Sequence, residues 1–318
     1  MTTSTAEPAP LLTGVEVEWI ASGLGGSGPD GELLGVAEGP VWFPDRQALS
    51  VNDSSTSTRH EWTEATGLTT VATDTGAANG STRDRQGRLL SCEQARRRVV
   101  RHEPDGSVTV VADRYRGLAL NRPNDVVVRS DGSIWFTDPL TFGVDTELDH
   151  AAVFRVSPDL SRINLVARDF NLPNGLAFSP DERTLYINDT NRMHIRAMEV
   201  ESWSVAGSRL DPDTDRVVIT MSGGPGQPDG MRLDAAGNIW CTGPDGIWVV
   251  APDGAHLATL DLGGRLATNL CFGGPDLRTL FVTTFTEVGR IRVGIPGLDP
   301  DREVTAPDGP VWTAGGKS

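Results

Sequence analysis

The sequence predicts an all-β protein, a six-bladed β-propeller of four-stranded antiparallel blades. A turn between two strand-like runs recurs six times along the 318 residues. Glycine (36) and proline (21) punctuate the whole chain, which favours short strands joined by turns over long helices. Further strand-like runs follow most copies of the turn, so that each repeat of about 40 to 55 residues resembles one propeller blade.

Each repeat begins with an apolar strand, a turn rich in Asp, Gly, Asn or Arg, and a second strand rich in β-branched and aromatic residues. These six pairs cover residues 41–53, 83–93, 127–138, 177–189, 232–243 and 271–284. We expect third strands within 97–106, 152–160, 194–200, 246–254 and 290–297. Fourth strands are expected within 68–74, 107–113, 163–169 and 256–262.

The early run GVEVEWI (14–20) can supply the outer strand of the last blade and close the ring. Closure removes exposed sheet edges, which otherwise invite pairing with other chains. We therefore expect one propeller domain over 1–318, with its blades between about 14 and 295. Residues 1–12 and 300–318 are expected to be peripheral or flexible.

Composition and charge narrow the classes of partner. The net charge of −15 argues against binding nucleic acid, and no apolar run is long enough to span a membrane. The N-terminus lacks the basic and apolar regions of a secretory signal. Three scattered cysteines, at positions 92, 241 and 271, predict free thiols and a cytoplasmic location. The sequence carries no sign of its oligomeric state.

Aligning the six turns exposes a second regularity. Seven residues before the turn Asp, or its equivalent, each copy has Glu, Asn or Asp. These positions are Glu38, Asn79, Asn124, Asn174, Asp229 and Asn269. In a propeller this register lies at the start of the innermost strand, so we expect a ring of oxygen-bearing side chains around the central axis.

Oxygen ligands from carboxylates and amides suit Ca²⁺ and other hard cations. No His or Cys falls on the ring, which argues against a His-rich catalytic zinc site. At any single position, an Asn or Asp before a strand can simply cap its own loop. Six such residues in one register favour a functional ring, of which four members would contact the metal.

Several segments together resemble the SMP-30/gluconolactonase/LRE-like family, which is also called regucalcin-like. They are EGPVWFPD, NRPNDVVVRSDGSIWFTDP, LPNGLAFSPDERTLYINDT and PDGMRLD. The resemblance extends from about residue 30 to 295. It implies a six-bladed propeller, lactonase or organophosphate hydrolase activity, and one divalent metal at the axis. Calcium is the first expectation, with Zn²⁺, Mn²⁺, Mg²⁺ or Fe²⁺ as alternatives.

By this resemblance, Glu38, Asn174 and Asp229 match metal ligands, and Asn124 contacts the metal or the substrate and water beside it. Arg122 matches a substrate-binding arginine. Asn79 and Asn269 share the register without a family role and are expected to line the substrate pocket or to hold water. The segment CEQARRR stands where close relatives would have CEH followed by GxRR, so the substrate need not be a simple aldonolactone.

These residues together predict a metal-dependent, gluconolactonase-like carboxylic ester hydrolase that opens lactone rings. A cation can polarise the lactone carbonyl, and Asp229 can act as general base toward water. Arg122 can hold a substrate oxygen through its planar donors. Two alternatives remain: a hydrolase of other esters or phosphotriesters on the same site, and a non-hydrolytic metal-binding propeller.

Overall fold

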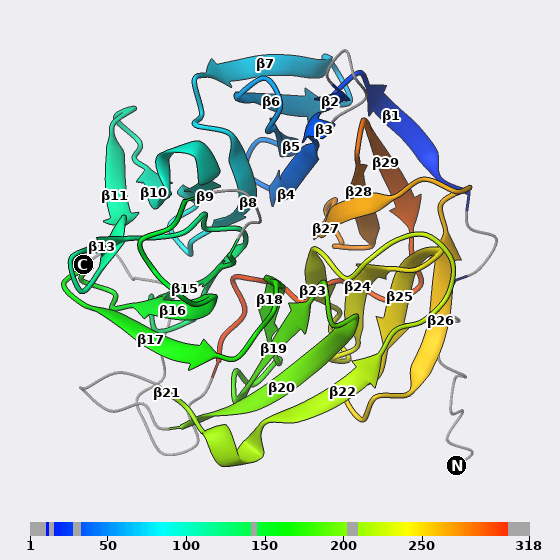
Figure 1. Cartoon of the computed structure of the whole chain (residues 1–318). Coiled ribbons are helices and arrows are strands. Elements are labelled where there is room, and N and C mark those ends of the chain that lie inside the picture. The colour runs from blue at the N-terminus through cyan, green and yellow to red at the C-terminus, as the bar shows by residue number, and fades with distance from the viewer. Residues whose placement is uncertain (1–10, 13–15, 28–32, 141–144, 202–208, 305–318) are drawn as a thin grey trace.

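The computed structural model describes residues 11–12, 16–27, 33–140, 145–201 and 209–304. These residues form six antiparallel sheets arranged radially around one axis, which confirms the predicted six-bladed β-propeller (Figure 1). In blades 1, 2, 3 and 5, counted along the chain, the strands follow one another outward from the axis in chain order, whereas blade 4 has β21 (Arg209–Leu210) and η2 (Pro212–Thr214) before its outer strand and blade 6 takes its outer strand from the N-terminal segment. The innermost strands therefore bring six equivalent segments of the chain together.

The blades are numbered here in chain order, each from its inner to its outer strand. Blade 1 comprises β4 (Ala37–Phe43), β5 (Ala48–Asp53), β6 (Thr58–Thr63) and β7 (Gly67–Thr73). Blade 2 comprises β8 (Ala78–Arg83), β9 (Leu89–Glu93), β10 (Arg98–His102) and β11 (Val108–Ala112). Blade 3 comprises β14 (Val126–Val128), β15 (Ile134–Asp138), β16 (Ala152–Val156) and β17 (Ile163–Arg168).

Blade 4 comprises β18 (Pro173–Phe178), β19 (Thr184–Asp189), β20 (His194–Glu201) and β22 (Arg216–Thr220), with the short β21 (Arg209–Leu210) beside β20. Blade 5 comprises β23 (Met231–Leu233), β24 (Ile239–Gly243), β25 (Gly246–Val250) and β26 (His256–Asp261). Blade 6 contains β27 (Ala267–Gly273), β28 (Thr279–Thr284) and β29 (Glu287–Arg292).

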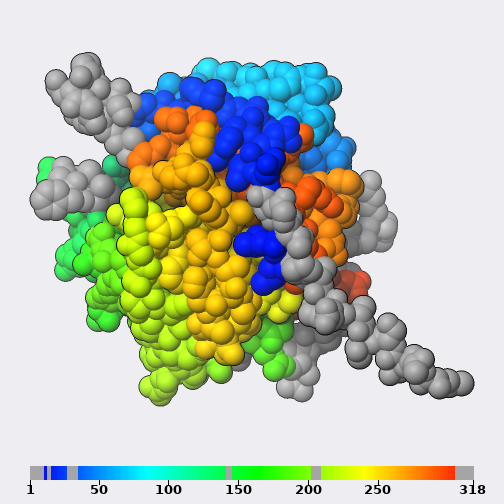
Figure 2. Space-filling view, turned by 90° about the vertical axis from the view of Figure 1, so that its right-hand side faces the viewer, coloured from blue at the N-terminus to red at the C-terminus, as the bar shows by residue number. Residues whose placement is uncertain are grey.

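The N-terminal strand β1 (Glu18–Ser22) pairs antiparallel with β29 and completes blade 6, as the closure argument predicted. Figure 2 shows this junction, with the blue N-terminal strand beside the orange strands of blade 6. The remaining elements are connections: the hairpins β2–β3 (Gly26–Ser27, Leu33–Gly35) and β12–β13 (Arg114–Tyr115, Leu118–Ala119), and the 3₁₀ turns η1 (Gln94–Arg96) and η2 (Pro212–Thr214).

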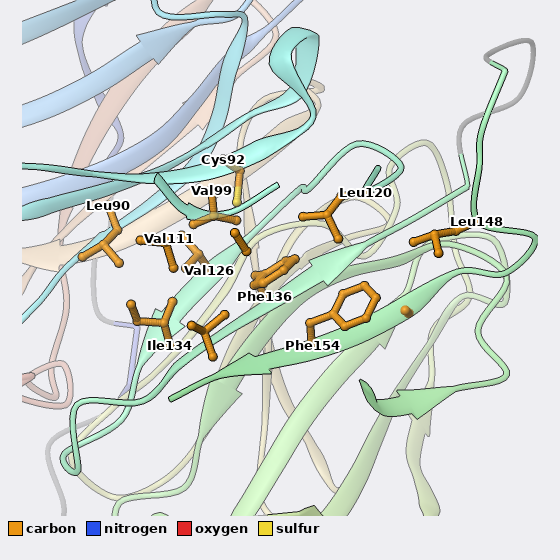
Figure 3. Packing of buried hydrophobic residues seen from close by; sticks show 13 residues of the cluster. Leu90, Cys92, Val99, Val111, Leu120, Val126, Ile134, Phe136, Leu148 and Phe154 are labelled. Carbon is orange, nitrogen blue, oxygen red and sulfur yellow. The ribbon is translucent and has the colours of Figure 1, made fainter. Parts of the chain in front are cut away.

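The core lies between neighbouring blades. Figure 3 shows one such cluster, in which side chains from β9 and β10 of blade 2 meet those of β14, β15 and β16 of blade 3. Phe136 and Phe154 are fully buried in it, with ring centroids 5.4 Å apart. Inner strands are buried on both faces, whereas outer strands such as β7 are partly exposed. Burial between blades therefore fixes the positions of the inner strands.

The end of the axis where the six inner strands begin is here called the entrance end, and the end where they finish is the turn end. Residues 296–304 cross the turn end. Arg302 donates to the carbonyl oxygen of Pro180 in blade 4, and Asp301 pairs with Arg83 of blade 2. Residues 300–304 thus contact two blades at this end, and residues 305–318, for which a peripheral position is also expected, lie outside the described part.

The three cysteines are free and buried. Among the residues that the structure describes, no helix is long and apolar enough to cross a membrane.

Replacing Phe136 by Ala should destabilise the fold by about 3–5 kcal/mol, because it leaves a cavity between two blades. Urea unfolding checks this. Val217→Ala is the matched control, since Val217 is 52% exposed on an outer strand, and its effect should stay within about 0.5 kcal/mol. Equal effects of the two substitutions would contradict the assignment of the core.

Candidate active site

The predicted ring residues lie at the entrance end. Glu38, Asn79 and Asn174 are the second residues of β4, β8 and β18. Asn124 and Asp229 stand two residues before β14 and β23. Five of the six predicted positions therefore occupy the same place at the start of successive inner strands.

The sixth predicted position, Asn269, is displaced by one residue. Gly80 N donates to the Asn124 carbonyl of the next blade (2.9 Å), and Gly230 N makes the equivalent bond to Thr268 (2.8 Å). Thr268, not Asn269, thus stands in the ring register of blade 6. The inner strands of blades 1, 2 and 4 have the same pairing irregularity near their start as β27, so the cause lies in the turn. Gly273 and Thr279 pair across five residues, whereas Phe43 and Ala48 pair across four, so counting back seven residues in blade 6 stops one position short.

Glycine follows several ring residues because neighbouring inner strands nearly touch. A Cβ on Gly39 would lie 2.3 Å from the Asn79 carbonyl oxygen, and one on Gly175 would lie 2.2 Å from that of Asp229. Gly39 also has φ of +54°, a conformation that disfavours other residues. These glycines let the backbones pack around the axis and hold the ring side chains close together.

Glu38 is buried, with 1% of its surface exposed. Its Oε2 accepts hydrogen bonds from Gly39 N (2.7 Å) and Asn269 Nδ2 (2.9 Å). Burial raises the pKa of Glu38 to about 7, against the lowering effect of these two bonds, and the charge of Asp125 raises it further. An ionised Glu38 therefore needs additional positive charge nearby.

Asp229 is half-buried at the first turn of blade 5, where its N–H donates to Thr242 Oγ1 (2.7 Å). Burial raises the pKa of Asp229 well above its usual value, and the charges of Glu38 and Asp125 raise it further. A hydrogen bond with Asn174 opposes this shift. The charge of Glu38 thus affects the ionisation of Asp229.

Asn174 offers a free acceptor to this site. Its Nδ2 donates to Thr190 Oγ1 (3.1 Å), which orients the amide, while its Oδ1 is buried and has no hydrogen-bond partner. A buried amide oxygen without a partner is costly, by about 1–3 kcal/mol. The cost disappears if a ligand with positive charge or a donor meets this oxygen.

The other asparagines are engaged differently. Asn79 Oδ1 accepts from the N–H of Gly80 (2.9 Å), and Asn269 Oδ1 accepts from that of Leu270 (2.8 Å). Asn269 also supports Glu38 through its Nδ2. Asn124 is half-buried and is positioned by its backbone N–H, which donates to the Thr137 carbonyl (2.9 Å). The predicted pocket-lining roles of Asn79 and Asn269 stay predictions.

Asp125 and Arg232 form an ion pair at the axis that the sequence did not predict. Asp125 is fully buried below the ring, and its Oδ2 lies 3.4 Å from Arg232 Nη1. Burial raises the pKa of Asp125 and Arg232 lowers it. The only signal in the sequence was a charged residue on each of two buried inner strands, 107 positions apart. Asp125 is the third carboxyl group at the axis.

Arg122 lies at the entrance end on the loop before β14. Its backbone N–H and that of Asn121 donate to the two oxygens of Asp138, each at 2.8 Å. Its guanidinium donates to Gln94 Oε1 (3.3 Å), and burial lowers its pKa. Asn121 also donates to the carbonyl oxygens of Asp138 and His150, and so braces the loop.

The donor set fits a hard divalent cation. Glu38 and Asp229 supply carboxylate oxygens, and Asn174 supplies an amide oxygen with no other partner. Within the described ranges, no three His, Cys, Asp or Glu side chains form a metal-binding group. A cation here would therefore depend on amide oxygens in addition to the two carboxylates.

The chain is similar to known proteins in sequence and in fold. The family model described as SMP-30/Gluconolactonase/LRE-like region matches residues 36–286. A gluconolactonase from Zymomonas mobilis is 31% identical over 280 residues, or 80% of this chain and 78% of the relative. The solved structure of a Xanthomonas campestris gluconolactonase has a TM-score of 0.76 and 29% identity over 91% of this chain and 96% of its own.

A regucalcin structure from Agrobacterium tumefaciens, described as a calcium-binding protein, is similar in fold. Its TM-score is 0.69 at 22% identity, and the match covers 82% of this chain and 91% of the regucalcin.

Replacing Asn174 by Ala should weaken Ca²⁺ binding at least about tenfold, because it removes the unpartnered amide oxygen. Titration calorimetry on chelator-treated protein measures this. Asn191→Ala, at an exposed asparagine beyond β19 in the same blade, is the control and should bind as the unaltered protein does. Unchanged affinity in Asn174→Ala would remove this residue from the site.

Proposed function

We propose that this chain, which belongs to the SMP-30/gluconolactonase/LRE-like family, is a metal-dependent hydrolase that opens lactone rings. One observation carries the proposal: two buried carboxyl groups that repel each other, those of Glu38 and Asp229, lie at the same end of the axis as an amide oxygen of Asn174 that has no partner. A scaffold does not need this arrangement, which is costly without a cation. The names of the similar gluconolactonases support a lactone as substrate.

Glu38, Asn174 and Asp229 would hold the cation, with Asn124 beside them, and Ca²⁺ suits these oxygen donors best. When bound, the cation supplies positive charge that polarises the lactone carbonyl and stabilises the developing oxyanion. It also offsets the repulsion among the axial carboxylates, whose pKa values burial raises.

Asp229 would act as the general base. Its carboxylate accepts a proton from water, and the water oxygen forms a bond to the lactone carbonyl carbon. The ring C–O bond then breaks, and the proton passes to the departing alkoxide oxygen, so that lactone and water yield a hydroxy acid. The Asp229 backbone is well placed for this role, since Thr242 Oγ1 and Asn188 Nδ2 bind its N–H and carbonyl oxygen.

Arg122 would orient the substrate. Its loop is fixed by Asp138 through two backbone amides, and its guanidinium makes a separate hydrogen bond to Gln94. Because Arg donors lie in one plane, they can bind a substrate hydroxyl or carboxylate in a defined orientation.

Asp229→Asn should lower kcat for lactone hydrolysis by about 10²–10⁴-fold, because the amide cannot accept the proton. Some metal binding should remain, since the amide keeps an oxygen. Titration of the acid released from a lactone panel, with a phosphotriester in parallel, measures the effect. Asp213→Asn, at an exposed aspartate of η2, is the control and should retain full activity.

The same panel separates the competing functions. The lactonase proposal predicts acid release from lactones that stops with chelator and returns with Ca²⁺. Faster turnover of the phosphotriester would favour the organophosphate hydrolase, and no turnover with Ca²⁺, Zn²⁺, Mn²⁺, Mg²⁺ or Fe²⁺ would favour a non-hydrolytic propeller. Undiminished hydrolysis by Asp229→Asn would contradict the role of this residue.

A further inference from the structure

The Arg122 guanidinium has a neutral partner. Its Nη2 donates to Gln94 Oε1 at 3.3 Å, and no ion pair to Arg122 occurs in the part of the chain that the structure describes. Gln94 is the first residue of η1, directly after β9, so it is carried by the entrance end of blade 2. An amide acceptor orients a guanidinium without neutralising it, and most of the five Arg donors stay available.

The neighbouring carboxylates are committed elsewhere. Glu93 Oε2 accepts from Arg98 Nε (2.6 Å) and Arg96 Nη1 (3.3 Å). Asp138 accepts two backbone amides, including that of Arg122 itself, rather than the guanidinium. Neither Glu93 nor Asp138 therefore forms an ion pair with the Arg122 guanidinium.

The axial charges balance without Arg122. Glu38, Asp125 and Asp229 carry three negative charges when ionised, and Arg232 pairs with Asp125. A divalent cation together with Arg232 supplies three positive charges. Arg122 consequently contributes a positive charge beyond this balance, in a half-buried position where an anion is screened less by solvent than at the surface.

We propose that Arg122, oriented by Gln94, is a carboxylate-recognition subsite, and that the preferred substrates are sugar lactones bearing a carboxylate away from the reacting carbonyl. This inference rests on the proposed lactonase function. Arg donors match a carboxylate in a planar, two-bonded geometry that a hydroxyl cannot reproduce. Gln94 is a positioning residue: it holds the guanidinium and preserves its charge.

The test compares kcat/KM of the Ca²⁺-loaded protein for a glucarolactone, which carries a carboxylate, and for gluconolactone, which does not. The carboxylated lactone should be favoured by about tenfold or more, mainly through KM, since one charge-assisted contact is worth about that factor. Its KM alone should rise steeply with ionic strength.

Two variants test whether the preference for the carboxylated lactone depends on the charge of Arg122. Arg122→Gln removes the charge, and Gln94→Glu places a carboxylate against Arg122; each should reduce the ratio of the two kcat/KM values to near one. Arg292→Gln removes an equal charge from a side chain that pairs with Asp276 in blade 6, and it should keep the full ratio. The unfolding midpoint of each variant establishes that it is folded.

The outcomes are distinct. Equal kcat/KM values for the two lactones in the unaltered protein, or a preference that survives Arg122→Gln, would overturn the subsite while leaving the lactonase proposal intact. Loss of the preference in Arg292→Gln would also overturn it, because the effect would then be one of net charge. Turnover of neither lactone would overturn the lactonase proposal and this inference with it.

Discussion

The close approach of the inner strands at the axis determines the rest of this site. Where glycine follows a ring residue, as at Gly39, Gly80 and Gly175, a Cβ would lie within 2.5 Å of a carbonyl oxygen in the next blade. The strands can close around the axis only because these positions carry no side chain. The same close packing brings Glu38, Asp229 and Asn174 together, although about 190 residues of chain separate the first two.

Two residues of the layer directly beneath the ring, which the glycines after the ring residues also occupy, are not glycine. Asp125 and Asn269 occupy it in blades 3 and 6, and their side chains make the polar contacts beneath the ring: Asp125 with Arg232, and Asn269 with Glu38. Burial raises the pKa of Glu38, Asp125 and Asp229, and repulsion from neighbouring carboxylates adds to the effect at Glu38 and Asp229. The chain thus accepts an electrostatic cost at its axis, which a bound cation would offset.

Much of the fold and of the site could be predicted from the sequence, because the spacing between the turn and the start of the inner strand is nearly the same in all six repeats. Counting back from each turn therefore predicted that five of the ring residues lie at the start of an inner strand, and the number of repeats predicted the fold. Counting failed at Asn269 because the turn of blade 6 is one residue longer than that of blade 1, so Thr268 takes the ring position. The third strand of blade 1, β6, was missed because its sequence TRHEWT is mostly polar and lacks the apolar pattern of a buried strand. The pairs Asp125–Arg232 and Gln94–Arg122 join different blades. A local sequence pattern cannot predict such contacts, because the paired residues are far apart in the chain.

The central claim is that a divalent cation sits at the axis on Glu38, Asn174 and Asp229. The most direct test is an anomalous difference map from crystals soaked in Mn²⁺, with data collected again after Ca²⁺ replaces it. The account predicts one strong axial peak within about 2.0–2.6 Å of a carboxylate oxygen of Glu38 and of Asp229 and of the Asn174 amide oxygen. A map with no peak at these three residues, or with the metal bound only elsewhere on the protein, would contradict it.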